Sequence, residues 1–234
     1  MEIVERPTRR ITILVGGFGS GKTETAINLA LRTARGGERC YLADLDLVTP
    51  FFRSREVGSV LEEAGVKVLF PPARFTQTDL PVLPPALHHA IRDRTARVIL
   101  DVGGSEVGAR AVAGFAESLA REEYDALCVV NPRRPFVMTA DEVVRSLRGI
   151  ELVSRLRITG LVANPHASGR TDWRVIRTGI HVVEEAARRL GLPIKFVCLH
   201  FERAVDKAPF EIAYPVLPLE LYMRPPWDDL QSGR

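Results

Sequence analysis

The sequence contains no run of about 18 apolar residues, so no segment is long enough to span a bilayer as a helix. Its first ten residues, MEIVERPTRR, do not have the pattern of a signal peptide. Only three of the 234 residues are cysteines, and each lies in a short apolar stretch without pair spacing, which argues against disulfides or a zinc site. These features predict a cytoplasmic protein with buried free thiols.

Lysine is scarce as well, because nearly all of the 32 basic residues are arginines. The 29 acidic residues almost balance them, and the net charge of +3 is not collected in a basic tail. Solvated helix faces are therefore favoured over nucleic-acid binding. Internal repeats and low-complexity tracts are also missing, and the composition, 46% hydrophobic and 26% charged, is typical of a globular protein. We expect a single domain over residues 1–234.

Short apolar runs alternate with longer helical patterns along the chain. The expected strands are 11–15, 40–44, 66–70, 97–102, 125–131, 158–164 and 194–199. The expected helices are 22–35, 53–64, 84–94, 107–122, 139–154 and 172–190. This alternation predicts an α/β fold with a doubly wound, mostly parallel sheet of about seven strands and helices on both faces. Two proline-rich segments, 70–87 and 208–234, are expected to be surface arms.

The stretch GGFGSGKT, residues 16–23, follows the first expected strand and opens the first expected helix. It fits the pattern G-x-x-x-x-G-K-[ST], in which glycines let the backbone turn tightly and point N–H groups at phosphate oxygens. Lys22 is expected to reach the β- and γ-phosphates, and the Thr23 hydroxyl to bind Mg²⁺. The predicted nucleotide-binding residues are Gly16, Gly17, Phe18, Gly19, Ser20, Gly21, Lys22, Thr23 and Glu24.

Aspartates follow two of the later strands. The segment LADLDL brings Asp44 and Asp46 to the carboxyl edge of the sheet, where we expect Asp44 in the Mg²⁺ shell and Asp46 beside the attacking water; a helix cap is the alternative for Asp46. The segment RVILDVGG places Asp101 like a Walker B aspartate, with Gly103 or Gly104 able to offer an N–H group to the γ-phosphate. The predicted catalytic residues are Lys22, Asp46 and Asp101; the predicted Mg²⁺ ligands are Thr23, Asp44 and Asp101; the predicted switch residues are Asp44, Gly103 and Gly104.

Together, GGFGSGKTETAINLA, the DLD after the second strand and LDVGG resemble the MinD/ParA/CobQ branch of the SIMIBI-class P-loop ATPases. The resemblance implies an ATP-binding and ATP-hydrolysing molecular switch that requires Mg²⁺ and acts on a protein partner. In this branch an asparagine that ends the sixth strand reads the adenine, and Asn164 occupies that place. A loop-turn role before Pro165 is the alternative for this residue.

One position departs from the branch. Gly17 stands where these proteins usually carry a second lysine that acts across a dimer, so slow turnover without a partner is expected and a homodimer is left open. At this point GFGSGKT is closer to the nickel-chaperone GTPases, although NPHAS replaces N-K-x-D and no Cys-x-Cys is present. A small-molecule kinase or ligase is a further alternative, with an acceptor pocket lined by residues 70–87. The sequence identifies neither the partner nor the biological process.

Overall fold

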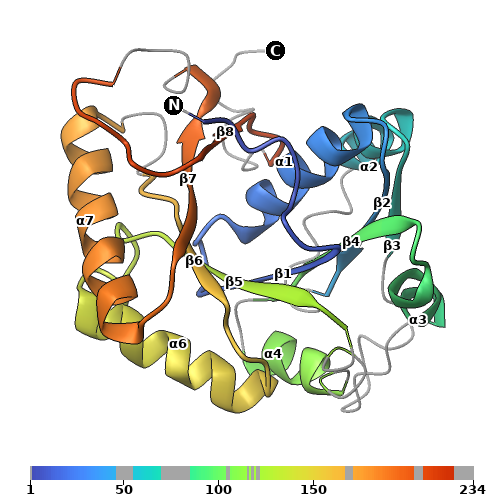
Figure 1. The fold of residues 1–234 in the computed structure, drawn as a ribbon, viewed down its shortest axis with the longest axis horizontal. Helices are drawn as coiled ribbons and strands as arrows, with labels where there is room; N and C mark the ends of the chain where they lie inside the picture. The colour runs from blue at the N-terminus through green and yellow to red at the C-terminus, as the bar shows by residue number, and fades with distance from the viewer. Residues whose placement is uncertain are drawn as a thin grey trace.

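The structure is a computed structural model, and it describes residues 2–45, 55–69, 85–103, 106–114, 116, 119, 122–166, 171–202 and 208–223. In these residues one sheet of eight parallel strands has the order β3-β2-β4-β1-β5-β6-β7-β8 (Figure 1). The strands are β1 (Ile11–Val15), β2 (Arg39–Asp44), β3 (Val66–Leu69), β4 (Ala96–Asp101), β5 (Tyr124–Val130), β6 (Gly160–Ala163), β7 (Ile194–His200) and β8 (Val216–Leu219). The helices are α1 (Lys22–Arg35), α2 (Arg55–Glu63), α3 (Pro85–Arg92), α4 (Glu106–Ala113), α6 (Ala140–Ser154) and α7 (Trp173–Leu190). The predicted α/β class is confirmed.

Helices cover both faces of the sheet (Figure 1). Because side chains alternate along a strand, Leu14 and Ile99 point to the face covered by α1 and α2, whereas Ile13 and Leu100 point to the face covered by α3, α4, α6 and α7. All four side chains are fully or almost fully buried. The strands are apolar on both faces for this reason, which is why their sequences read as continuous apolar runs.

The eighth strand corrects the sequence-based expectation of about seven strands. β8 lies inside the segment 208–234, which was expected to be a surface arm, and its four residues are buried. Pro218 argued against a strand in this segment, because proline lacks the N–H group that a central strand needs. β8 is the last strand of the sheet, and among the described residues its outer side makes one isolated parallel bridge, between Val216 and Ile3, and pairs with no further strand. This outer side tolerates the missing donor of Pro218. Of the other expected arm, only 85–87 is described, and it begins α3.

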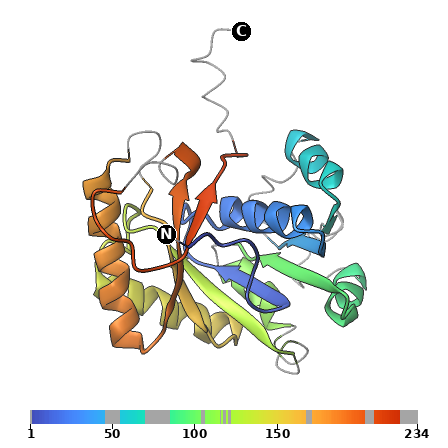
Figure 2. The same cartoon turned by 45° about the horizontal axis from the view of Figure 1, so that its top comes forward.

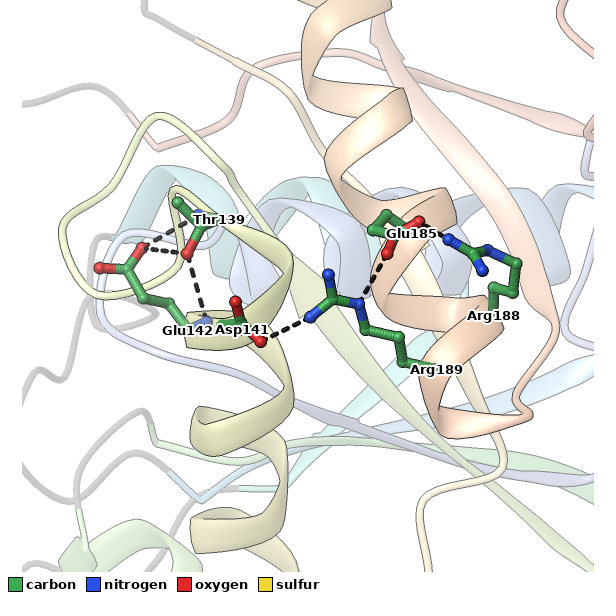
Figure 3. A network of polar contacts seen from close by, with 6 residues as sticks. All are labelled: Thr139, Asp141, Glu142, Glu185, Arg188 and Arg189. Atoms are coloured by element: carbon green, nitrogen blue, oxygen red, sulfur yellow. Dashed lines mark hydrogen bonds and ion pairs between the residues drawn. The ribbon is translucent and has the colours of Figure 1, made fainter.

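Helices α6 and α7 lie side by side in Figures 1 and 2. Thr139 begins α6 with a capping box, in which its side chain accepts from the Glu142 N–H and Glu142 accepts from the Thr139 N–H (Figure 3). An ion pair between Asp141 and Arg189 joins the start of α6 to the last turn of α7 (Figure 3). These contacts hold the end of the β5–α6 loop, which borders the site described below.

The three cysteines, Cys40, Cys128 and Cys198, are buried and free, as expected. Burial raises the pKa of each thiol to about 12. Across the described residues, no helix combines the length and apolar composition needed to cross a membrane.

Candidate nucleotide-binding site

The loop between β1 and α1 lies at the carboxyl edge of the sheet, where β1 is flanked by β4 and β5. Two of its glycines are required by close packing. Gly16 has a φ of 146°, and a Cβ atom there would lie 2.4 Å from the Val129 carbonyl oxygen. Gly21 has a φ of 89°, and its Cβ would lie 2.1 Å from Nδ2 of Asn164. A larger residue fits neither position, so the glycine spacing reflects how the loop packs on the ends of β5 and β6.

Hydrogen bonds within the loop take up some of its carbonyl oxygens. The Gly17 oxygen accepts from the Ser20 N–H at 3.2 Å and from Lys22 Nζ at 3.1 Å. The Gly21 oxygen accepts from the N–H and the hydroxyl of Thr25 at 3.0 and 2.8 Å. A carbonyl oxygen that faced a phosphate would repel it, so these bonds favour a loop conformation in which N–H groups face the anion.

On the β4 side, the loop meets the predicted magnesium ligands. The Thr23 hydroxyl donates to Asp101 Oδ2 at 2.6 Å. Asp44 and Asp101 are register partners at the ends of neighbouring parallel strands, and both are buried. Within the described residues no cluster of three or more His, Cys, Asp or Glu side chains forms a metal cage. One hydroxyl and two carboxylates fit Mg²⁺, which prefers oxygen ligands and takes its remaining ligands from phosphate and water.

Three further predicted residues follow these strands. Asp46 and Gly104 lie outside the described residues, so their roles stay predictions. Gly103 is buried two residues after β4, next to Val102, whose N–H donates to the Leu14 carbonyl oxygen. The β4 exit is therefore held against β1, on the side of the loop where Asp101 lies.

Two further residues of the predicted nucleotide-binding set are Phe18 and Glu24, and their roles there stay predictions. Phe18, in the middle of the loop, is 78% exposed. Glu24, in the first turn of α1, accepts hydrogen bonds from the N–H groups of Tyr222 and Met223, which follow β8. Burial raises the pKa of the Glu24 carboxyl above its usual value of 4.5, although the two N–H donors act in the opposite direction. The Glu24 side chain thus holds the chain after β8 against the first turn of α1.

Asn164 follows β6 directly, as expected from the sequence, and its amide contacts the loop between β1 and α1. It is 3% exposed, and its Nδ2 donates to the Ser20 carbonyl oxygen at 2.7 Å. Its Oδ1 atom is buried as well. The side chain therefore packs against the loop between β1 and α1, and a contact with adenine stays a prediction.

Sequence reasoning missed two residues that contact the loop. Asn131 directly follows β5, and its Nδ2 lies 3.4 Å from the Gly19 oxygen and 3.0 Å from the His166 oxygen. Arg134 Nε donates to the same Gly19 oxygen at 3.1 Å. The signal for Asn131 was present, because VVNP ends one apolar run just as VANP ends the next.

A pair of histidines lies at the neighbouring strand ends. The rings of His166, after β6, and His200, at the end of β7, meet edge to face with centroids 6.2 Å apart. Burial, with a smaller contribution from His200, lowers the pKa of His166 to about 4. His166 is therefore neutral near pH 7.

A scan against protein-family models finds no match, and a search of curated proteins finds none either. Solved structures with the same arrangement of strands and helices do exist. Cell division protein FtsY from Thermotoga maritima matches with a TM-score of 0.56 and 20% identity, over 90% of this chain and 68% of that chain. The fold is that of a P-loop NTPase.

Two further structures are similar to this fold. One is the 54 kDa signal recognition particle protein from Aeropyrum pernix K1 in complex with GDP, with a TM-score of 0.52 and 21% identity over 82% of this chain and 42% of that one. The other is FlhF complexed with GTP and Mg²⁺, with a TM-score of 0.51 and 11% identity over 81% of this chain and 65% of that one. All three neighbours are SIMIBI-class P-loop proteins, and this chain spans between 42% and 68% of their lengths.

Proposed function

We propose that this chain is a Mg²⁺-dependent, ATP-binding and ATP-hydrolysing switch of the MinD/ParA type that acts on a protein partner in the cytoplasm. The observation that carries the proposal is the 2.6 Å contact between the Thr23 hydroxyl and Asp101 Oδ2. It joins the phosphate-binding loop to the strand end that carries the Walker B-like aspartate, with Asp44 beside it in register. A glycine-rich turn that only capped a helix would not need this pair of buried carboxylates.

Each residue has a defined task in this proposal. Lys22 Nζ, which contacts the Gly17 oxygen in the structure, would turn to the β- and γ-phosphates. Thr23, Asp44 and Asp101 would hold Mg²⁺, which neutralises charge on the phosphate oxygens when it is bound. Asp46 would orient the attacking water, and that task rests on the sequence alone.

The choice of ATP rests on the sequence and on the MinD/ParA resemblance, because NPHAS stands where a guanine-reading N-K-x-D would be expected. GTP is the second candidate. It is favoured by the solved structures of similar fold, of which one contains GDP and another contains GTP with Mg²⁺. Titration of ATP and GTP in the presence of Mg²⁺ decides between them, and tighter binding of GTP would remove ATP from the proposal.

Slow turnover without a partner is part of the same proposal. A Cβ atom at Gly17 would meet no atom within 4 Å in the described structure, so this position has room for a Cβ atom but supplies no cation. The missing charge must then come from another residue or from the partner. An arginine supplied to the γ-phosphate raises the rate by roughly 10³-fold or more in related chemistry.

The experiment that tests the proposal compares three proteins: the parent, Thr23→Ser and Thr23→Val. Serine keeps the hydroxyl that contacts Asp101, whereas valine has a similar shape and lacks it. We expect single-turnover ATP hydrolysis to depend on Mg²⁺ in the parent and in Thr23→Ser, and to be lost in a folded Thr23→Val. Hydrolysis at the parent rate by Thr23→Val would contradict the proposed site.

A further inference from the structure

The outer side of the phosphate-binding loop is held by side chains from other parts of the chain. A loop that points its N–H groups at an anion must direct its carbonyl oxygens elsewhere, and buried carbonyl oxygens need donors. The loop's own residues and Thr25 supply these donors for the oxygens of Gly17 and Gly21. The oxygens of Gly19 and Ser20 receive theirs from the segments that follow β5 and β6.

The two asparagines occupy equivalent places on neighbouring strands. Val130 and Ala163 are register partners at the ends of β5 and β6, and Asn131 and Asn164 are the residues that follow them. Both asparagines are nearly fully buried. Backbone bonds fix the position of Asn164, because its N–H donates to the Val130 oxygen at 2.8 Å. The strand register therefore sets two amide groups side by side beneath the loop.

Arg134 reinforces the outer end of this arrangement. Its Nε shares the Gly19 oxygen with Asn131, and its guanidinium lies so close to Gly19 that a Cβ atom there would be 2.9 Å from Nε. Among the residues that the structure describes, the neighbouring Arg133 makes no such contact, and its backbone N–H donates to Asn131 Oδ1. Two adjacent arginines of equal charge thus differ in whether they contact the loop.

We propose that Asn164, Asn131 and Arg134 are positioning residues that bind the outward carbonyl oxygens of Gly19 and Ser20 and thereby keep the loop in its triphosphate-binding conformation. The inference rests on the proposed function, since it concerns the same phosphate site. It assigns the amide of Asn164 to the phosphate end of the ligand. A residue that reads adenine would affect ATP alone, whereas a residue that shapes the loop affects every triphosphate equally.

The test measures the affinities of Mg²⁺-ATP, Mg²⁺-GTP and inorganic tripolyphosphate for the parent, Asn164→Ala, Arg134→Ala and Arg134→Lys, with Arg133→Ala as the matched control. Loss of the buried donor to Ser20 should weaken every ligand that the parent binds by the same factor, roughly 5- to 100-fold in Asn164→Ala. Arg134→Ala should lose roughly 2- to 10-fold, because Asn131 still reaches Gly19. Arg134→Lys should not restore binding, since lysine keeps the charge but lacks the Nε donor, and Arg133→Ala should match the parent.

A loss confined to ATP in Asn164→Ala would overturn the inference and leave the proposed ATP site intact. Unchanged affinities in Asn164→Ala and Arg134→Ala would also overturn it, even if their melting temperatures fall, because a merely structural role lowers stability without changing the affinity of the folded protein. If Asn164→Ala does not fold, the affinities of Arg134→Ala and Arg134→Lys, compared with those of Arg133→Ala, decide the inference, because Arg134 is exposed. A parent that binds none of the three ligands would remove both the inference and the proposed function.

Discussion

Asp101→Asn separates the charge of the Walker B-like residue from its shape. Asparagine keeps an oxygen that can accept from the Thr23 hydroxyl, so the 2.6 Å contact can survive as a neutral hydrogen bond. A hydrogen bond to a charged group contributes about 1.5–3 kcal/mol and a neutral one about 0.5–1.5 kcal/mol, a difference of about 1 kcal/mol. Removing one of two neighbouring buried carboxylates also relieves repulsion with Asp44. We therefore expect the ligand-free variant to be folded and to differ from the parent by no more than about 1 kcal/mol.

The effect of Asp101→Asn on Mg²⁺ binding should be much larger than its effect on the stability of the ligand-free protein. A ligand at about 100 times its dissociation constant stabilises the folded state by about 2.7 kcal/mol, which raises the melting temperature of a chain of this length by about 5–11 °C. Loss of a charged ligand should increase the Mg²⁺ concentration needed for this rise by about tenfold or more. Melting temperatures measured at a fixed ATP concentration and increasing Mg²⁺ concentrations give the Mg²⁺ midpoint, the concentration at which half of this rise is reached.

Asp125→Asn is the matched control, because Asp125 is also a buried strand aspartate but lies at the amino end of β5, away from the loop between β1 and α1. There it pairs with Lys195 at 3.2 Å. Its substitution should lower the melting temperature of the ligand-free protein and leave the Mg²⁺ midpoint unchanged. The same Mg²⁺ midpoint in Asp101→Asn and in the parent would refute the assignment of Asp101.

Three other predictions concern ATP turnover and the pH dependence of stability. Lys22→Ala should lose most ATP affinity, whereas Asp46→Ala should keep it and lose at least about 10²-fold in single-turnover hydrolysis; a folded Asp46→Ala that hydrolyses at the parent rate would exclude Asp46 from the mechanism. Because the folded state raises the pKa of Glu24, the stability that protonated Glu24 contributes below pH 4.5 is lost as the pH rises through the raised pKa. Measured by urea unfolding, the free energy of unfolding of Glu24→Gln should therefore rise relative to that of the parent as the pH increases from 4.5. A difference between the two proteins that does not change with pH would contradict the argument from burial. For His166 the pH dependence runs in the opposite direction, because its pKa is lowered from 6.5 to about 4. The stability that neutral His166 contributes above pH 6.5 is lost as the pH falls towards 4. His166→Gln should lose less stability over this range in the same assay.

The sequence was sufficient to predict the alternation of strands and helices, the parallel sheet and the bounds of α1, because burial on both faces leaves a strong apolar pattern. It was not sufficient for β8. Whether Pro218 is tolerated depends on the position of its strand in the sheet, and that position is decided by packing among distant segments.

The position of the glycine-rich loop between β1 and α1 could be predicted because its pattern lies in eight consecutive residues. The contact between Thr23 and Asp101 joins positions 78 apart. The sequence placed both residues at one edge of the sheet, since parallel strands bring their carboxyl ends together, and their role as Mg²⁺ ligands stays a prediction. The contact of Glu24 with Tyr222 and Met223 could not be foreseen, because it requires the unexpected strand β8.

The strand order explains why the two flanks of the loop differ in chemistry. β1 lies between β4 and β5, so residues that follow β4 and β2 approach the loop from one side, and residues that follow β5 and β6 approach it from the other. The first side carries the carboxylates of Asp44 and Asp101, which suit a cation. The second side carries the amides of Asn131 and Asn164, whose NH₂ groups donate hydrogen bonds to carbonyl oxygens of the loop. An asparagine at a strand end is ambiguous in the sequence, and its role becomes defined only when the sheet shows on which side of the loop it lies.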